Sequence, residues 1–139
     1  MSQKEKLKIS LFLLRFSVFV VMLMWTLDKF INPAHATKVY EKFYFIGGLG
    51  DVLMYTLAVF ELIILVLFLG GLYKKYIYGI VLFFHAVSTL SSFKQYLSPY
   101  EGANLLFFTA WPMLAACIVL FLLKEQDELL TIRRPVNET

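Results

Sequence analysis

The chain has 139 residues, of which 60% are hydrophobic and 17% are charged, with a formal net charge of +3. These fractions exclude an ordinary soluble domain, and the modest charge comes without the basic, aromatic-rich runs of nucleic-acid-binding proteins. The only cysteine, Cys117, excludes an internal disulfide, a CxxC pair and a cysteine zinc site. The apolar residues gather in four long blocks, so we expect any chemistry to lie within or at the rims of a single membrane domain, residues 1–139.

Each apolar block is long enough to predict a membrane-spanning helix, which needs about 20 mostly apolar residues. The predicted spans are about residues 7–28, 49–69, 76–97 and 103–123. The first is interpreted as a retained span because no small-residue cleavage site follows it. The last two connections are short, which favours antiparallel neighbours. The predicted fold is therefore all-α, an antiparallel four-helix bundle integral to a membrane.

Two segments outside the spans carry their own expectations. In the longer connection between the first two spans, about residues 29–48, Val39, Phe43 and Ile46 can share one helical face. This pattern favours a short helix on the outer surface or over the mouth of the bundle, and an ordered loop is the alternative. For the charged tail, residues 124–139, we expect a helical extension followed by disorder after Pro135.

Lysine and arginine placement predicts the orientation of the bundle. The basic residues on the side of the termini are Lys4, Lys6, Lys8, Lys74, Lys75, Lys124, Arg133 and Arg134. Those on the opposite side are Lys29, Lys38, Lys42 and Lys94. The excess on the first side predicts that both termini, and the tail, are cytoplasmic.

Three ionisable residues, Arg15, Glu61 and His85, fall inside predicted spans. Such groups are costly in a bilayer and usually face the bundle interior. Counted from the span boundaries at ~1.5 Å per residue, all three lie about 12–14 Å above the inner surface. Three hypotheses stay open: a buried Arg15–Glu61 ion pair with His85 bonded to one of them, a ligand or cofactor pocket, and a proton path along a polar stripe of the third span.

Two further features bear on such a pocket. Pro112 is expected to kink the fourth span and open space, which makes its neighbour Trp111 a candidate wall, although a lipid-facing tryptophan is equally ordinary. An outer-rim polar cluster is expected from Asp28, Lys29, Asp51 and Lys94. The cluster also has a structural explanation, since an acid such as Asp51 favours a helix N-terminus and Lys94 can reach the headgroups.

Several of these residues fall into a familiar pattern. The sequence reads LR at residues 14–15, WTLDKFINP at 25–33, FEL at 60–62 and LGGLY at 69–73. It resembles the DoxX family of small four-helix bacterial membrane proteins. The resemblance implies a four-helix bundle in the bacterial inner membrane and draws attention to Arg15, Asp28, Lys29 and Glu61. Some members are similar to the membrane subunit of thiosulfate:quinone oxidoreductase, and others accompany redox, metal-stress or maturation systems.

These observations lead to three functional hypotheses. The first is a redox-associated subunit that binds a quinone or other lipophilic cofactor through Arg15, Glu61, His85 and Trp111. The second is a non-enzymatic scaffold or assembly factor, and the third is a binder of lipid-like ligands. Expected partners are the bilayer and another membrane or redox protein, or a second copy of the chain, and no nucleic acid. No metal site is expected, because His35 and His85 lie at different levels, and no catalytic residue can be assigned.

Overall fold

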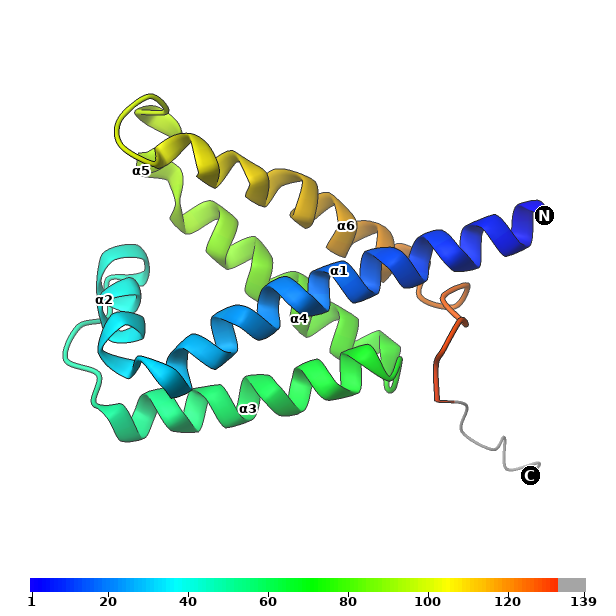
Figure 1. The fold of residues 1–139 in the computed structure, drawn as a ribbon, viewed down its shortest axis with the longest axis horizontal. Coiled ribbons are helices and arrows are strands. Elements are labelled where there is room, and N and C mark those ends of the chain that lie inside the picture. Colours follow the sequence, from blue (N-terminus) through cyan, green and yellow to red (C-terminus); the bar gives the residue numbers. More distant parts are fainter. Residues whose placement is uncertain (133–139) are drawn as a thin grey trace.

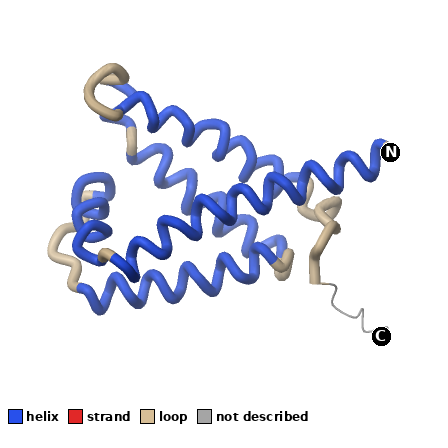
Figure 2. Tube along the Cα trace, viewed as in Figure 1, coloured by secondary structure: helices blue, strands red, loops and turns tan. Residues whose placement is uncertain are grey.

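The structure is a computed structural model that describes residues 1–132. Its elements are α1 (Gln3–Ile31), α2 (Pro33–Tyr44), α3 (Asp51–Leu69), α4 (Lys74–Ser91), α5 (Phe93–Leu97), the 3-10 helix η1 (Asn104–Thr109) and α6 (Ala110–Leu122). Every regular element among the described residues is a helix, which confirms the all-α expectation (Figure 2).

Local sequence explains where the first helices begin and end. Ser2 and Glu5 form a reciprocal capping box at the start of α1, in which each side chain accepts a hydrogen bond from the other's backbone N–H. Asn32 ends α1, and its side chain accepts from the N–H of His35 to cap α2, whose first residue is Pro33. The short helix expected in the first connection is therefore present.

The last two predicted spans are each interrupted. Helix α4 ends at Ser91, and α5 forms a separate short helix after Ser92. The following segment begins as the 3-10 helix η1 and becomes α-helical at Ala110. Pro112 lies in the first turn of α6, where a proline's missing N–H breaks no internal α-helical hydrogen bond. The irregularity expected at Pro112 is thus a change of helix type just before it.

The four long helical segments form two diverging pairs (Figure 1). Helix α1 packs against α3 and α6, and α4 packs against α3 and α6 as well. At one end, here called the open end, the α1–α3 pair separates from the α4–α6 pair and α2 lies between them. The turn at residues 70–73 and the segment 123–132 lie at the other, closed end. The buried apolar core includes Leu11, Phe68, Tyr78 and Leu120, from all four segments.

Three helical segments are long and apolar enough to cross a membrane, namely Gln3–Ile31, Asp51–Leu69 and Asn104–Leu122. Their outward side chains include large exposed apolar groups such as Leu13, Val52 and Leu106. Helix α4 is not among the three. It begins with two lysines and carries His85 and hydroxyl side chains on its later turns, so it lacks the long uninterrupted apolar stretch of the other three.

Candidate functional site

A cavity of about 380 Å³ lies between the two helix pairs at the open end. Side chains from α1, α2, α3, α4, η1 and α6 line it, and α2 forms one wall of the space between the diverging helices. Its volume falls in the range of small-molecule sites, and its mixture of apolar walls and few polar groups is typical of them. The polar groups lie on two walls, one around Glu61 and one around His85.

Glu61 organises the first wall by accepting hydrogen bonds from three side chains. Lys29 Nζ lies 2.9 Å and Thr26 Oγ1 lies 3.1 Å from Glu61 Oε2, both from α1. Tyr40 Oη, from α2, lies 3.5 Å from Oε1. The Lys29 side chain is 10% exposed and that of Glu61 is 19% exposed, so the ion pair is largely shielded from solvent. One carboxylate thus connects α1, α2 and α3.

Tyr40 contributes to this wall in two ways. Burial raises the pKa of its phenol, and the neighbouring Glu61 carboxylate raises that pKa further, so the hydroxyl keeps its proton and remains a donor. The Lys29 ammonium lies 5.7 Å from the centre of the Tyr40 ring, within the range of a cation–π contact. The lysine therefore holds α2 over the cavity through the ring, while the hydroxyl reaches the carboxylate.

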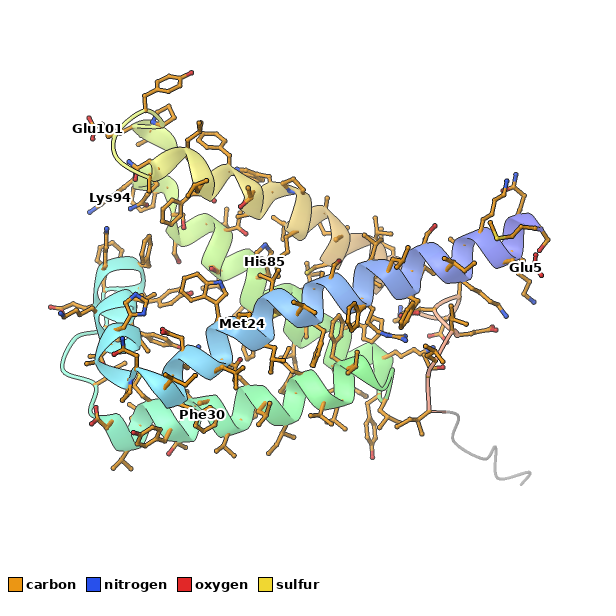
Figure 3. All side chains as sticks on the ribbon, viewed as in Figure 1. Glu5, Met24, Phe30, His85, Lys94 and Glu101 are labelled. Atoms are coloured by element: carbon orange, nitrogen blue, oxygen red, sulfur yellow. The ribbon has the colours of Figure 1, made fainter. Side chains whose placement is uncertain are left out.

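His85, in the second half of α4, marks the second wall (Figure 3). Its Nε2 lies 3.0 Å from the carbonyl oxygen of Ala110 at the start of α6. Because a carbonyl only accepts, Nε2 must carry the proton in this bond. Ser88 and Ser92 line the same wall one and two turns further along the chain. Glu61 and His85, expected at one level, do face the same cavity.

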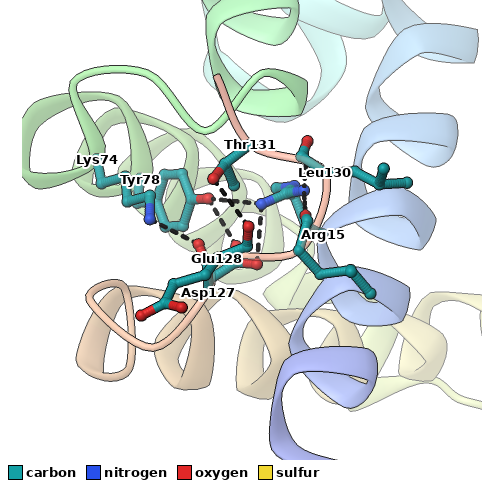
Figure 4. Close-up of polar contacts among 8 residues, drawn as sticks. Arg15, Lys74, Tyr78, Asp127, Glu128, Leu130 and Thr131 are labelled. Carbon is teal, nitrogen blue, oxygen red and sulfur yellow. Dashed lines mark hydrogen bonds and ion pairs between the residues drawn. The ribbon is translucent and has the colours of Figure 1, made fainter. Parts of the chain in front are cut away.

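Arg15 does not line this cavity, and the hypothesis of a buried Arg15–Glu61 ion pair is wrong. Its Nη1 lies 2.8 Å from Asp127 Oδ1 at the closed end, and both side chains are fully buried (Figure 4). Its Nη2 donates to the backbone oxygens of Leu129 at 2.6 Å and Leu130 at 3.3 Å. The arginine is therefore bonded to the C-terminal segment.

Arg15 lies far from Glu61 because of the position of α1 relative to its neighbours. Helix α1 begins at Gln3, and its first turns extend beyond the closed end (Figure 1). Arg15 consequently lies level with the α3–α4 turn, where a Cβ built on Gly71 would be 3.4 Å from its Nη1. Lys29, which does pair with Glu61, follows Arg15 by fourteen residues, about 21 Å along the helix at ~1.5 Å per residue. The predicted span starts at residue 7, whereas α1 starts at Gln3, so Arg15 lies nearer the closed end than its predicted depth.

The C-terminal segment is held by further contacts, which replace the expected helical extension. Asp127 Oδ2 accepts from Tyr78 Oη at 2.7 Å, and the Asp127 backbone oxygen accepts from Lys74 Nζ at 2.6 Å (Figure 4). The Ile132 N–H donates to the Gly70 oxygen at 2.8 Å. Residues 124–132 contain turns and no helix, and the disorder expected after Pro135 lies outside the described residues.

Sequence reasoning missed Asp127 as the partner of Arg15. The available signal was that an arginine inside an apolar helix requires an acid nearby. The tail, residues 124–139, offers four acids, Glu125, Asp127, Glu128 and Glu138, and only the fold selects among them.

The residues expected at the outer rim have separate surroundings. Asp28 Oδ2 lies 2.6 Å from His35 Nδ1, which joins α1 to α2. Lys29 pairs with Glu61 in the cavity wall. Lys94 Nζ lies 5.3 Å from the centre of the Phe45 ring, and Asp51 occupies the first turn of α3, where its charge favours the helix dipole.

Trp111 lies outside the cavity lining. Its side chain is exposed, and its ring centre is 5.6 Å from that of Tyr96. The aromatic walls come instead from residues in other elements, including Trp25, Phe43, Phe84 and Phe107.

Comparison of the chain with family models, with curated proteins and with solved structures gives no match. The resemblance to the DoxX family therefore stays a prediction from the residues quoted above. Among residues 1–132, no group of three or more histidine, cysteine, aspartate or glutamate side chains is arranged to hold a metal ion.

Proposed function

We propose that this chain is a multi-pass protein of the bacterial inner membrane that binds a lipophilic molecule with a polar head group in the cavity at the open end. In this proposal α4 supplies a fourth crossing, and both termini are cytoplasmic. The cytoplasmic side is the closed end, which carries Lys74 and Lys75 and the segment 123–132. This arrangement agrees with the excess of basic residues expected on that side.

The polar groups of α4 are compatible with a crossing because the fold supplies partners for them. Thr89 Oγ1 donates to the His85 backbone oxygen at 2.8 Å, and Ser92 Oγ donates to that of Ser88 at 3.2 Å. His85 itself bonds the Ala110 oxygen. Polar residues within membrane spans usually face the protein interior and are bonded there, and His85, Thr89 and Ser92 follow this rule.

The observation that carries the proposal is the composition of the cavity. Aromatic and aliphatic side chains form most of its lining, and the Lys29–Glu61 pair and His85 supply polar contacts on two walls. A flat ring can pack between the aromatic side chains while its polar atoms reach these groups. A quinone is the ligand class that the DoxX resemblance suggests, with the chain acting as a redox-associated subunit beside a partner protein.

Organic extraction of the purified protein tests this proposal. The chain is purified in mild detergent and extracted, and bound molecules are identified by chromatography and mass spectrometry. The matched variant is Lys29→Met/Glu61→Gln, which removes the polar pair without leaving a lone charge. We expect a lipophilic molecule in near-equal ratio to the wild-type protein and several-fold less in the variant. Equal amounts in both proteins, or none in either, contradict the proposal.

A further inference from the structure

We infer that the cavity selects a neutral head group with a hydroxyl that donates a hydrogen bond to Nδ1 of His85. The chemical class is that of phenols and related hydroxyaromatic lipophiles. This inference rests on the proposed function, because it specifies the ligand of the same cavity.

The tautomer of His85 indicates that the ligand must donate a hydrogen bond. The Nε2–H donates to the Ala110 oxygen at 3.0 Å, so a neutral ring carries its lone pair on Nδ1 and can only accept there. Within residues 1–132, Nδ1 makes no hydrogen bond. His85 lines the cavity, which leaves Nδ1 as the ring atom for a ligand, and the partner it requires is a donor.

The serine hydroxyls on the same wall do not compete with this requirement for a donor. Ser92 Oγ uses its hydrogen on the Ser88 backbone oxygen and also shares a hydrogen bond with the Tyr96 side chain, so it requires no partner from a ligand. The Ser88 hydroxyl can donate or accept, because it can rotate. The α4 wall therefore offers His85 Nδ1 as a fixed acceptor, and a ligand that brings only acceptors leaves it unpaired.

The opposite wall determines the charge of the head group. Lys29, Thr26 and Tyr40 all direct a hydrogen at Glu61. The Lys29 and Glu61 charges cancel, so the pair exerts little net attraction on an anionic head group, which would also lose its hydration on binding. A neutral hydroxyl avoids that cost. For a quinone-type ligand, the hydroquinone form is the one that supplies the donor.

Three matched probes test the inference: para-dodecylphenol, its methyl ether and para-dodecylbenzoic acid. All three have the same alkyl chain and benzene ring. The phenol carries a hydrogen-bond donor, the ether only an acceptor, and the benzoic acid a negative charge when ionised. Binding is measured in nanodiscs at about pH 8, where an ordinary histidine with pKa about 6.5 is neutral. Trp25, which lines the cavity, serves as the fluorescent reporter in a Trp111→Phe background.

Two variants of His85 separate its proposed bond to the ligand from its bond to the Ala110 oxygen. His85→Gln keeps a donor for the Ala110 oxygen and an acceptor for the ligand, whereas His85→Phe has neither. Ser91→Ala is the control on the same helix, because Ser91 lies outside the lining. We expect the phenol to bind about three- to tenfold more tightly than the ether, the effect of one hydrogen bond. His85→Phe is expected to abolish this preference, and His85→Gln and Ser91→Ala to keep it.

The outcomes test separately whether the cavity binds a lipophile and whether that ligand donates a hydrogen bond to His85. If the phenol and the ether bind equally well to the wild type, or His85→Phe retains the preference, the inference is overturned while the cavity stands as a lipophile site. Tighter binding of the benzoate than of the phenol also overturns it. If none of the three probes binds the wild type, the proposed function fails and the inference fails with it.

Discussion

Arg15 Nη1 lies 2.8 Å from Asp127 Oδ1, and neither side chain is exposed to solvent. One residue comes from the middle of the first apolar helix and the other from the C-terminal segment. A buried charge that loses its partner is strongly destabilising, commonly by about 3–5 kcal/mol. The pair therefore makes the C-terminal segment part of the folded helical structure.

Asp127→Leu leaves the Arg15 guanidinium buried and without its carboxylate. We expect the free energy of unfolding, measured by denaturant titration in mixed micelles, to fall by about 3–5 kcal/mol. The double variant Arg15→Met/Asp127→Leu removes both charges and should cost clearly less than Asp127→Leu alone. As a control, Lys8→Ala removes the partly exposed Lys8–Glu128 pair and should cost at most about 1 kcal/mol. Strictly additive effects of Arg15→Met and Asp127→Leu would contradict a direct pair.

Truncation of the chain tests the same contact without changing a helix. Ending the chain after Lys124 removes Asp127 and the backbone oxygens that bond Arg15. We expect a lower melting temperature in detergent than for the full chain. Ending it after Ile132 keeps every one of these contacts, and this shorter truncation should melt close to the full chain. Similar melting of both truncations would show that the segment contributes little.

Gly71 is required where the C-terminal segment packs against the α3–α4 turn. Its φ is +64°, and a Cβ there would lie 2.5 Å from Thr131 Cγ2. Gly71→Ala should therefore lower stability by at least about 1 kcal/mol from the left-handed conformation alone, with the steric conflict added. Gly70→Ala is the matched control, because the backbone of Gly70 is right-handed and its nearest neighbour is the end of the Ile132 side chain, at 3.2 Å. Thermal unfolding of both variants checks the difference, and equal losses would contradict it.

Much of the helical architecture could be predicted from the sequence, because apolar runs and capping residues are local signals. The predicted second span, 49–69, nearly matches α3, and the short helix in the first connection matches α2. The breaks at Ser92 and Ala110 were not predicted in position, since hydropathy does not distinguish one helix type from another.

Contacts between residues far apart in the sequence could not be predicted. Equal depth in a membrane does not determine which helices are neighbours or how far each one extends beyond the others. The offset of α1 moved Arg15 to the closed end and brought Lys29 to Glu61. The role of Asp127 could not be predicted, because a charged tail is ordinarily a solvated segment. No local sequence pattern indicates that this tail folds back onto the helices.

The proposed topology can be tested with single cysteines. In a Cys117→Ser background, Lys75→Cys marks the start of α4 and Tyr100→Cys marks the connection beyond its far end, and both positions are exposed. If α4 crosses the membrane, an impermeant maleimide should label Tyr100→Cys in intact spheroplasts and Lys75→Cys only after permeabilisation. Labelling of both positions from the same side would contradict a crossing by α4. Labelling of Lys75→Cys alone would reverse the orientation.

The most direct test for a ligand in the cavity is to fill the cavity with a large side chain and measure how much lipophilic molecule remains bound. Ser88→Trp places a large side chain on the α4 wall of the cavity, whereas Leu90→Trp places the same side chain on the exposed face of the same helix, where Leu90 is 64% exposed. Native mass spectrometry of each purified protein measures the fraction with a bound lipophilic molecule. We expect a bound molecule in the wild type and in Leu90→Trp, and its loss in Ser88→Trp. Equal occupancy in all three proteins would contradict a ligand in this cavity.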